Sequence, residues 1–214
     1  MPKISLCAIV RDEERFLADC LASVRGVADE LVVVDTGSTD RTRAIALAAG
    51  ATVVDFAWID DFAAARYAGL ARASGTHVLV LDADERLARG AGAAVRRAAE
   101  NGELAIGMLP LHDADALDAR EEDVLAGRRR LAPPAWLPRF FRRDPGRVFH
   151  RRVHETILVP GEALPPRSLE AVDAPIVHLG EVKELRAARG KDRRNTTLLE
   201  RAVAEDPADG ELAG

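Results

Sequence analysis

Two patterns of apolar residues alternate along residues 1–90. Short apolar runs such as Ile4–Val10 and Glu30–Val34 are typical of buried strands, and each is followed by apolar residues at helical spacing. Connections rich in Ser, Thr, Asp and Gly separate these segments. The alternation predicts an α/β fold with a mainly parallel central sheet and helices on both of its faces.

The expected elements of this half follow directly from the pattern. We expect strands at 4–10, 30–34, 52–55 and 78–81. Asp12 is expected to cap the first helix, whose apolar face carries residues such as Phe16 and Leu17. The second helix spans about 41–49 and ends at Gly50, and Asp60-Asp61 open the third.

The signal is weaker after Glu85. The pattern predicts a helix at 88–101 and strands at 104–109, 136–141, 153–157 and 176–179. Mixed charges at 112–130 indicate a mobile or amphipathic connection, and 160–175 is expected to be a proline-rich loop. A last helix runs from Val182 to about Glu205, before Asp206-Pro207.

Composition and charge exclude several classes of protein. The chain has 214 residues, enough for one domain with an appendage, and its net charge of −5 gives no electrostatic case for a nucleic-acid partner. Cys7 and Cys20 read as small buried apolar residues. The first residues run directly into an expected strand, so we expect no leader, and no apolar run reaches the length of a membrane span. We therefore expect a cytoplasmic protein, and peripheral contact with a membrane stays open.

The residues richest in candidate chemistry are Asp82-Ala83-Asp84, directly after the apolar run 78–81. Side chains two positions apart in an extended chain point the same way, about 6.6 Å apart along the strand. Open α/β sheets bind ligands at the carboxyl ends of their strands. Two carboxylates placed there suit a divalent cation such as Mn²⁺ or Mg²⁺, although an isolated pair is also typical of a solvated acidic turn.

Four segments taken together resemble glycosyltransferase family 2. They keep the order and spacing of that family: Ser5–Glu14, Val33–Asp40, Ala64–Arg66 and Leu81–Glu85. Arg139–Arg142, Val153–Glu155 and His178 resemble the later half of a bacterial branch more loosely. The resemblance implies the GT-A fold, with residues 1–90 as a nucleotide-binding half, 91–182 as an acceptor half and 183–214 as a helical tail.

The resemblance also implies roles for individual residues. Contacts to a nucleotide-diphospho-sugar are expected from Val10, Arg11, Glu13, Asp35, Arg66, Asp82 and Ala83. Asp84, Asp82 and His178 are expected to bind Mn²⁺ or Mg²⁺. Three of these residues have a purely structural alternative: Asp35 could cap a turn, Arg66 could pair with Asp60 or Asp61, and His178 could be a core histidine.

An inverting transfer also needs a base that deprotonates the acceptor. Glu155 is the candidate, oriented by His154, with Asp113 and Asp115 behind it. The alternatives for Glu155 are acceptor binding or a structural salt bridge. A basic cluster on the predicted last helix suits either a solvated face or an anionic surface: Arg186, Arg189, Lys191, Arg193 and Arg194.

The sequence thus predicts an inverting, metal-dependent transferase that uses a UDP-sugar or a related donor. The acceptor is a surface glycan, a lipid-linked molecule or a peptide, and nothing in the sequence chooses among them. A non-catalytic sugar-nucleotide or carbohydrate binding module of the same fold is the alternative. In similar bacterial proteins a Lys-x-Arg-Arg-Asn helix leads into tetratricopeptide-type repeats, so we expect this chain to be a minimal or truncated form.

Overall fold

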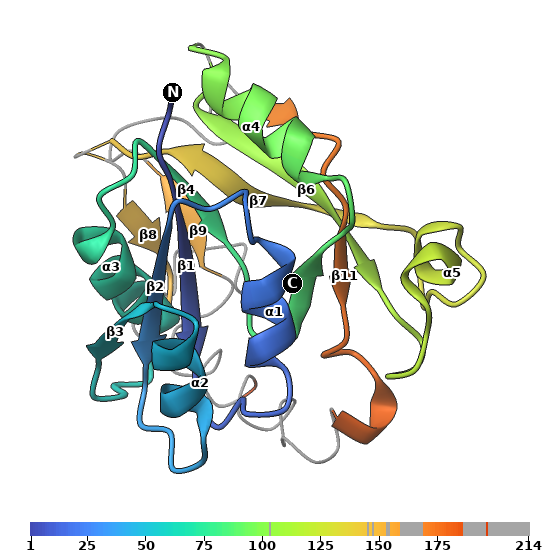
Figure 1. Cartoon of the computed structure of the whole chain (residues 1–214), viewed down its shortest axis with the longest axis horizontal. Coiled ribbons are helices and arrows are strands. Elements are labelled where there is room, and N and C mark those ends of the chain that lie inside the picture. Colours follow the sequence, from blue (N-terminus) through green and yellow to red (C-terminus); the bar gives the residue numbers. More distant parts are fainter. Residues whose placement is uncertain are drawn as a thin grey trace.

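One mixed sheet forms the centre of the molecule (Figure 1). The computed structural model describes residues 1–102, 104–144, 146, 148–152, 155–158, 169–185 and 196. Within them, nine strands share one sheet in the order β3-β2-β1-β4-β7-β6-β11-β5, with β10 beside β6, and β8 and β9 form a separate hairpin. The sheet strands are β1 (Ile4–Val10), β2 (Glu30–Asp35), β3 (Thr52–Asp55), β4 (His77–Val80), β5 (Glu85–Leu87), β6 (Ile106–Asp113), β7 (Ala135–Arg142), β10 (Leu169–Ala171) and β11 (Ile176–His178).

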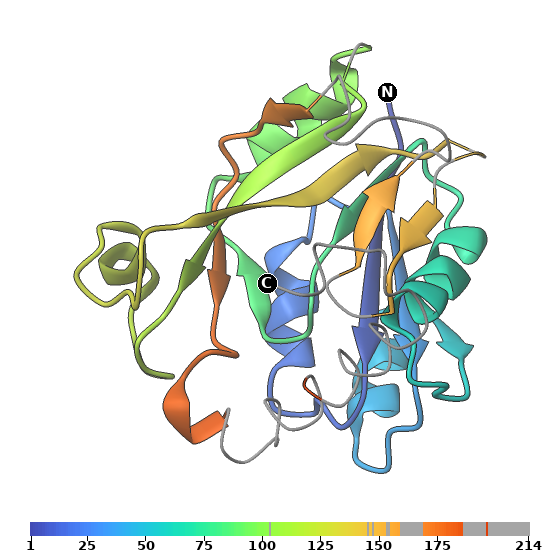
Figure 2. The same cartoon turned by 180° about the vertical axis from the view of Figure 1, so that it is seen from behind.

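The helices lie on both faces of this sheet, as the sequence predicts. Figure 1 shows α1 and α2 in front of the parallel strands, and Figure 2 shows the β8–β9 hairpin on the opposite face, where α3 also packs. The remaining elements are α1 (Leu17–Ser23), α2 (Thr42–Ala48), α3 (Phe62–Arg72), α4 (Gly92–Glu100), α5 (Glu121–Leu125), β8 (Val148–His150) and β9 (Thr156–Leu158).

Two apolar cores, one on each face, explain why the strands read as continuous apolar runs. Alternate residues of β1 point to opposite faces, so Leu6 joins the core under α1 and α4 while Cys7 joins the core under α3. Both cysteines are buried and free, which confirms their reading as small apolar residues. The packing of both faces fixes the register of the central strands.

The parallel strands all end at one edge of the sheet. β1 pairs in parallel with β2 and with β4, and Val10 lies opposite Asp35. We call this row, defined by Val10, Asp35 and Asp82, the carboxyl edge. The second half of the sheet is antiparallel where β7 pairs with β4 and β6. β11 then lies between β6 and β5, so the chain's late residues return beside the start of β5.

The strands and helices expected from residues 1–90 are confirmed, with one correction. Asp61 caps α3 by accepting a hydrogen bond from the N–H of Ala64, and Gly50 follows α2 with φ of 81°. Asp12 does not cap α1, which begins at Leu17. Its φ is 53°, and its carboxylate accepts a hydrogen bond from the N–H of Thr39 instead, because the loop after β1 turns towards the loop after β2.

The later half differs more from expectation. The helix expected at 88–101 starts at Gly92, and the short strands β5 and β10 were not predicted, since three residues carry no period. The segment 112–130 extends β6 and contains α5 rather than forming only a connection. Of the helix predicted beyond Leu185, the structure describes Thr196, which is helical. The basic cluster and His154 lie outside the described residues. Among the described helices, none has the length and apolar character needed to cross a bilayer.

Gly75, in the connection between α3 and β4, is a test of this packing. A Cβ there would lie 2.6 Å from Oγ of Ser5 and 2.8 Å from the carbonyl oxygen of Lys3. Because Lys3 contributes backbone, which cannot move aside cheaply, Gly75→Ala should lower the free energy of unfolding by about 1–3 kcal/mol. A shifted urea midpoint would show this. Gly102→Ala, with nothing within 4 Å of its added Cβ, is the control and should leave the midpoint unchanged.

Candidate active site

The carboxyl edge gathers the polar residues of the first half. The Asp82-Ala83-Asp84 turn follows β4, and Asp35 ends β2 beside Val10. Val10 and Ala83 are buried, while Arg11 is exposed in the loop after β1. Parallel strands therefore bring these predicted residues to one edge, as open α/β sheets require of a ligand site.

Hydrogen bonds tie the two loops at this edge together. The carbonyl of Val10 accepts from the N–H of Thr36 at 3.0 Å, and the N–H of Glu13 donates to Oγ1 of Thr42 at 2.6 Å. Oδ1 of Asp35 accepts from the N–H of Ser38 at 2.8 Å, so it does cap its own turn. The loops after β1 and β2 thus form one connected surface.

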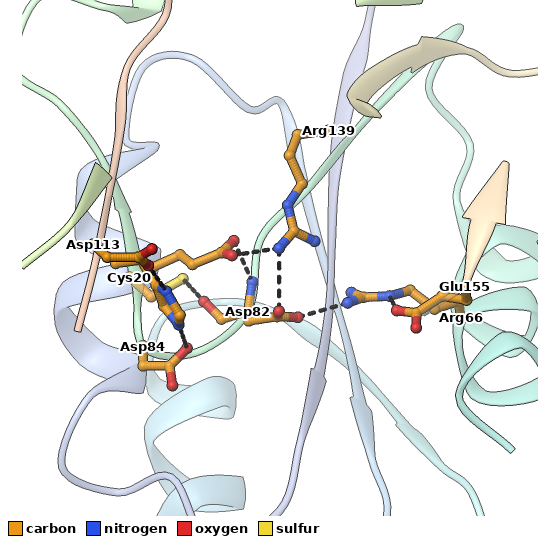
Figure 3. A network of polar contacts seen from close by, with 9 residues as sticks. Cys20, Arg66, Asp82, Asp84, Asp113, Arg139 and Glu155 are labelled. Atoms are coloured by element: carbon orange, nitrogen blue, oxygen red, sulfur yellow. Dashed lines mark hydrogen bonds and ion pairs between the residues drawn. The ribbon is translucent and has the colours of Figure 1, made fainter. Parts of the chain in front are cut away.

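Asp82 lies between two arginines, as Figure 3 shows. Nη2 of Arg66 donates to one carboxylate oxygen at 2.6 Å, and Nη2 of Arg139 donates to the other at 3.3 Å. Burial acts to raise the pKa of Asp82, but the charges of Arg66 and Arg139 outweigh it and hold the pKa well below its usual range. Asp82 is therefore a fixed negative charge at the carboxyl edge.

Arg66 also binds Glu155, which the sequence separates from it by 89 positions. Nε of Arg66 donates to Oε1 of Glu155 at 2.9 Å, and the guanidinium is almost fully buried. The pairing with Asp60 or Asp61 that the sequence left open is not made; Arg66 links Asp82 to Glu155 instead. The predicted base and the predicted donor-binding aspartate are thus connected through one side chain.

Arg139 was not predicted as a site residue, and a β-bulge explains why. Gly107 lies opposite Phe140, yet the next residue, Met108, lies opposite Pro138, so Arg139 is the extra residue of β7. A bulge interrupts the two-residue alternation of a strand and redirects a side chain. Strict alternation would give no reason to expect the Arg139 guanidinium at the carboxyl edge.

The bulged arginine neutralises Glu85, which is 1% exposed. Nη2 of Arg139 forms an ion pair with Oε1 of Glu85, and Oε2 accepts from the N–H of Asp82 at 2.9 Å. Burial raises the pKa of Glu85 to about 7, against the lowering effect of Arg139. Cys20 supports the same turn by donating to the carbonyl of Asp82 at 3.3 Å. Glu85 therefore fixes the conformation of the Asp82-Ala83-Asp84 turn.

Both arginines keep one buried donor without a hydrogen-bond partner among the described residues. These donors are Nη1 of Arg66 and Nε of Arg139. An unmade hydrogen bond at a buried donor costs about 1–3 kcal/mol. A cluster of buried charges that includes such unpaired donors is typical of a functional site rather than of a structure optimised for stability.

Asp84 and His178 face each other on the other side of the turn. Nε2 of His178 and Oδ1 of Asp84 are 3.7 Å apart, longer than a hydrogen bond, and both side chains are more than nine-tenths buried. Burial acts to lower the pKa of His178, but its hydrogen bond to Asp113 and the charge of Asp84 raise the pKa above its ordinary value. A Cβ on Gly180 would lie 2.5 Å from Nε2 of His178, so a larger residue there would displace part of this pair.

Asp84 and His178 fit a divalent cation between them. Two metal–ligand bonds of about 2.1 Å each span up to about 4.2 Å, which accommodates the 3.7 Å separation of these donors. Asp82 is directed to the arginines, and no group of three His, Cys, Asp or Glu side chains in the described part of the chain is arranged around one metal position. The structure thus brings two of the three predicted ligands together.

Comparison with known proteins identifies the family. The model described as "Glycosyl transferase family 2" matches residues 5–158. A TPR repeat-containing protein of Synechococcus elongatus is 38% identical over 217 residues, covering 99% of this chain and 51% of that protein. An uncharacterized glycosyltransferase of Rickettsia typhi is 37% identical over 89 residues, 42% of this chain and 30% of that protein.

The crystal structure of residues 1–349 of S. aureus TarS has the same fold. It superimposes with a TM-score of 0.57 at 15% identity, over 97% of this chain and 74% of that one. The chain therefore belongs to glycosyl transferase family 2 and has the GT-A fold. The chain spans about half the length of the Synechococcus elongatus protein, whose name describes it as containing TPR repeats.

Removing Arg139 should expose the cost of burying Glu85. Arg139→Met leaves a carboxylate that is 1% exposed without its cation, so we expect the free energy of unfolding to fall by about 3–5 kcal/mol near neutral pH. Urea denaturation followed by circular dichroism measures this loss. Arg142→Met is the control, because Arg142 is exposed and donates to the carbonyl of Gly102 at 3.4 Å. Equal midpoints for the two variants would contradict the role given to Arg139.

Proposed function

We propose that this domain is an inverting, metal-dependent glycosyltransferase whose donor is a nucleotide-diphospho-sugar, in particular a UDP-sugar. The observation that carries the proposal is the arrangement at the carboxyl edge. There Asp35 and the Asp82-Ala83-Asp84 turn share one edge of the sheet, and Arg66 joins Asp82 to Glu155. The names of the rickettsial relatives support a transferase of this family.

In this proposal the loops after β1 and β2 bind the nucleotide. Asp35 accepts hydrogen bonds from the base through the oxygen that does not cap its own turn. Val10, Arg11, Glu13 and Ala83 form the adjoining wall. Asp82 accepts from the ribose, since the arginines keep it ionised. Arg66 orients Asp82 for this contact.

Asp84 and His178 hold Mn²⁺ or Mg²⁺ in this proposal, and Asp82 completes the ligand set. When bound, the cation offsets the negative charge that develops on the departing diphosphate. The histidine nitrogen favours Mn²⁺ over Mg²⁺, which prefers oxygen ligands. The acidic surroundings of His178, formed by Asp84 and Asp113, support a cation at this position.

Glu155 acts as the base in the transfer itself. An acceptor hydroxyl attacks the anomeric carbon, its proton passes to Glu155, and the bond from that carbon to the diphosphate breaks with its electron pair leaving on the nucleotide. Attack from the face opposite the diphosphate inverts the anomeric configuration. Arg66 holds the Glu155 carboxylate in a fixed orientation for this step.

The wider assignments belong to the same proposal. Residues 1–90 form the donor half, 91–182 the acceptor half, and 183–214 a helical tail. The acceptor is a cell-surface glycan, a lipid-linked molecule or a peptide, reached from the cytoplasm, with peripheral contact to the membrane. The alternative is a non-catalytic module that binds a sugar nucleotide. The ion pair between Arg66 and Glu155 favours this alternative, because it gives Glu155 a structural role.

The donor assignment is tested by calorimetric titration with UDP, GDP and CDP, each with Mn²⁺ and then with EDTA. We expect one nucleotide, UDP, to bind and to lose affinity when EDTA removes the metal. Asp84→Ala should abolish the metal-dependent part of this affinity because it removes a cation ligand. Asp19→Ala, which breaks a surface pair with Arg86, is the control and should bind like the unmodified protein. Unchanged Mn²⁺-dependent binding by Asp84→Ala would remove Asp84 from the metal site.

Glu155→Gln separates the transferase from the non-catalytic module. The amide cannot take the acceptor's proton, so turnover should fall about 10²–10⁴-fold while the affinity for UDP is kept. With water as acceptor, release of UDP from UDP-sugars gives an assay that needs no knowledge of the natural acceptor. A variant that keeps full turnover would place the base elsewhere. An unmodified protein that binds UDP without releasing it from any sugar or acceptor tested would favour the binding module.

A further inference from the structure

We propose that Asp113 is a positioning residue that fixes the ring of His178 so that Nε2 faces the divalent cation together with Asp84. The inference rests on the proposed metal-dependent function and adds a residue outside the ligand set. From the sequence, Asp113 is a second candidate for the base, behind Glu155. The structure gives it a different partner: Oδ1 of Asp113 lies 2.6 Å from Nδ1 of His178.

The register of the sheet places these residues side by side. β11 pairs in parallel with β6, and His178 lies opposite Asp113. On its other side β11 pairs with β5, where His178 lies opposite Glu85. Neighbouring residues across paired strands present their side chains on the same face. The pairing of the backbones therefore places Asp113, His178 and Glu85 in one row, whatever conformations their side chains adopt.

Backbone hydrogen bonds also fix the distance from this row to Asp84. The N–H of Leu179 donates to the carbonyl of Asp84 at 3.0 Å, and the N–H of Ala114 donates to the carbonyl of His178 at 2.9 Å. The ends of β6 and β11 and the turn after β4 are thus held to one another. A site supported in this way keeps its ligands in place before the metal arrives.

The contact from Asp113 determines which ring nitrogen can bind a metal. A carboxylate only accepts hydrogen bonds, so at 2.6 Å it requires the proton on Nδ1 of His178. In the neutral ring, the lone pair is then on Nε2, the atom that faces Asp84 at 3.7 Å. Carboxylate–histidine–metal arrangements of this kind raise the basicity of the ligand and fix its orientation.

Gly180 lies directly against the side chains of Asp84 and His178. A Cβ at this position would overlap Oδ2 of Asp84 and Nε2 of His178. Asp84 and His178 are more than nine-tenths buried. A side chain at position 180 would therefore displace one of these two donors, whereas glycine leaves both in place.

The test measures Mn²⁺ affinity in the presence of UDP by the loss of the free Mn²⁺ signal in electron paramagnetic resonance. Asp113→Asn should weaken Mn²⁺ binding about 10–100-fold, as changes to residues behind a ligand do. Asp118→Asn is the matched control, since its side chain is 88% exposed and pairs with Arg129. It should bind Mn²⁺ like the unmodified protein. Equal affinity in Asp113→Asn and the control would overturn the inference.

A double-mutant cycle shows whether Asp113 acts through His178. In the His178→Ala background, Asp113→Asn should change the Mn²⁺ affinity little further, because there is no ring left to orient. An equal loss in both backgrounds would mean that Asp113 acts only by its charge or on the fold, and would overturn the inference. If the unmodified protein binds UDP but no Mn²⁺, the metal-dependent function fails and the inference fails with it. That result is distinct from binding that is merely insensitive to Asp113.

A measurement without any variant covers the case in which Asp113→Asn does not fold. Nitrogen-15 correlation spectra of the metal-free protein at alkaline pH report the tautomer of neutral His178. We expect the proton on Nδ1, because Asp113 accepts a hydrogen bond from that atom. In a histidine without such a partner, no contact selects Nδ1 as the protonated nitrogen. A proton on Nε2 would overturn the inference even if the variant cannot be studied.

Discussion

The charge balance around Asp82 is the constraint on which the rest of the site depends. Two buried guanidinium groups, those of Arg66 and Arg139, serve three carboxylates, and each arginine reaches Asp82 while holding a second acid. Burying an acid without such a partner is costly, so these contacts decide where α3, β7 and the segment before β9 can lie. With Asp84 and Asp113 added, the carboxylates outnumber the positive charges, which makes the region suited to a cation.

The site is assembled from both halves of the chain. The parallel strands supply Asp35 and the Asp82-Ala83-Asp84 turn, and the later half supplies Arg139, Glu155 and His178. The family match ends at residue 158, yet the partner of Asp84 comes from β11, beyond that limit. Neither half therefore contains the complete arrangement, and the closing of the sheet by β11 is part of building the site.

The features that depend on residues close together in the chain were predicted correctly from the sequence. Apolar runs gave β1 to β4, and the end of the last run at Leu81, one residue beyond β4, placed Asp82 and Asp84 correctly after a strand. What it could not predict depends on pairing between distant residues. The contact of Asp113 with His178 follows from the register of β6 and β11. The partners of Arg66 come from the turn after β4 and from 89 positions away. Local patterns contain no information about such register.

The bulge in β7 has a consequence for how this strand tolerates change. Its extra residue lets Leu137 and Phe140 face the same core while Phe141 faces the other, and it turns Arg139 out of both. Deleting Arg139 would restore regular pleating and remove the guanidinium. Deleting Pro138 would instead bring Arg139 opposite Met108, as a regular member of the strand. The length of this strand therefore decides where the guanidinium lies, in addition to the identity of its residues.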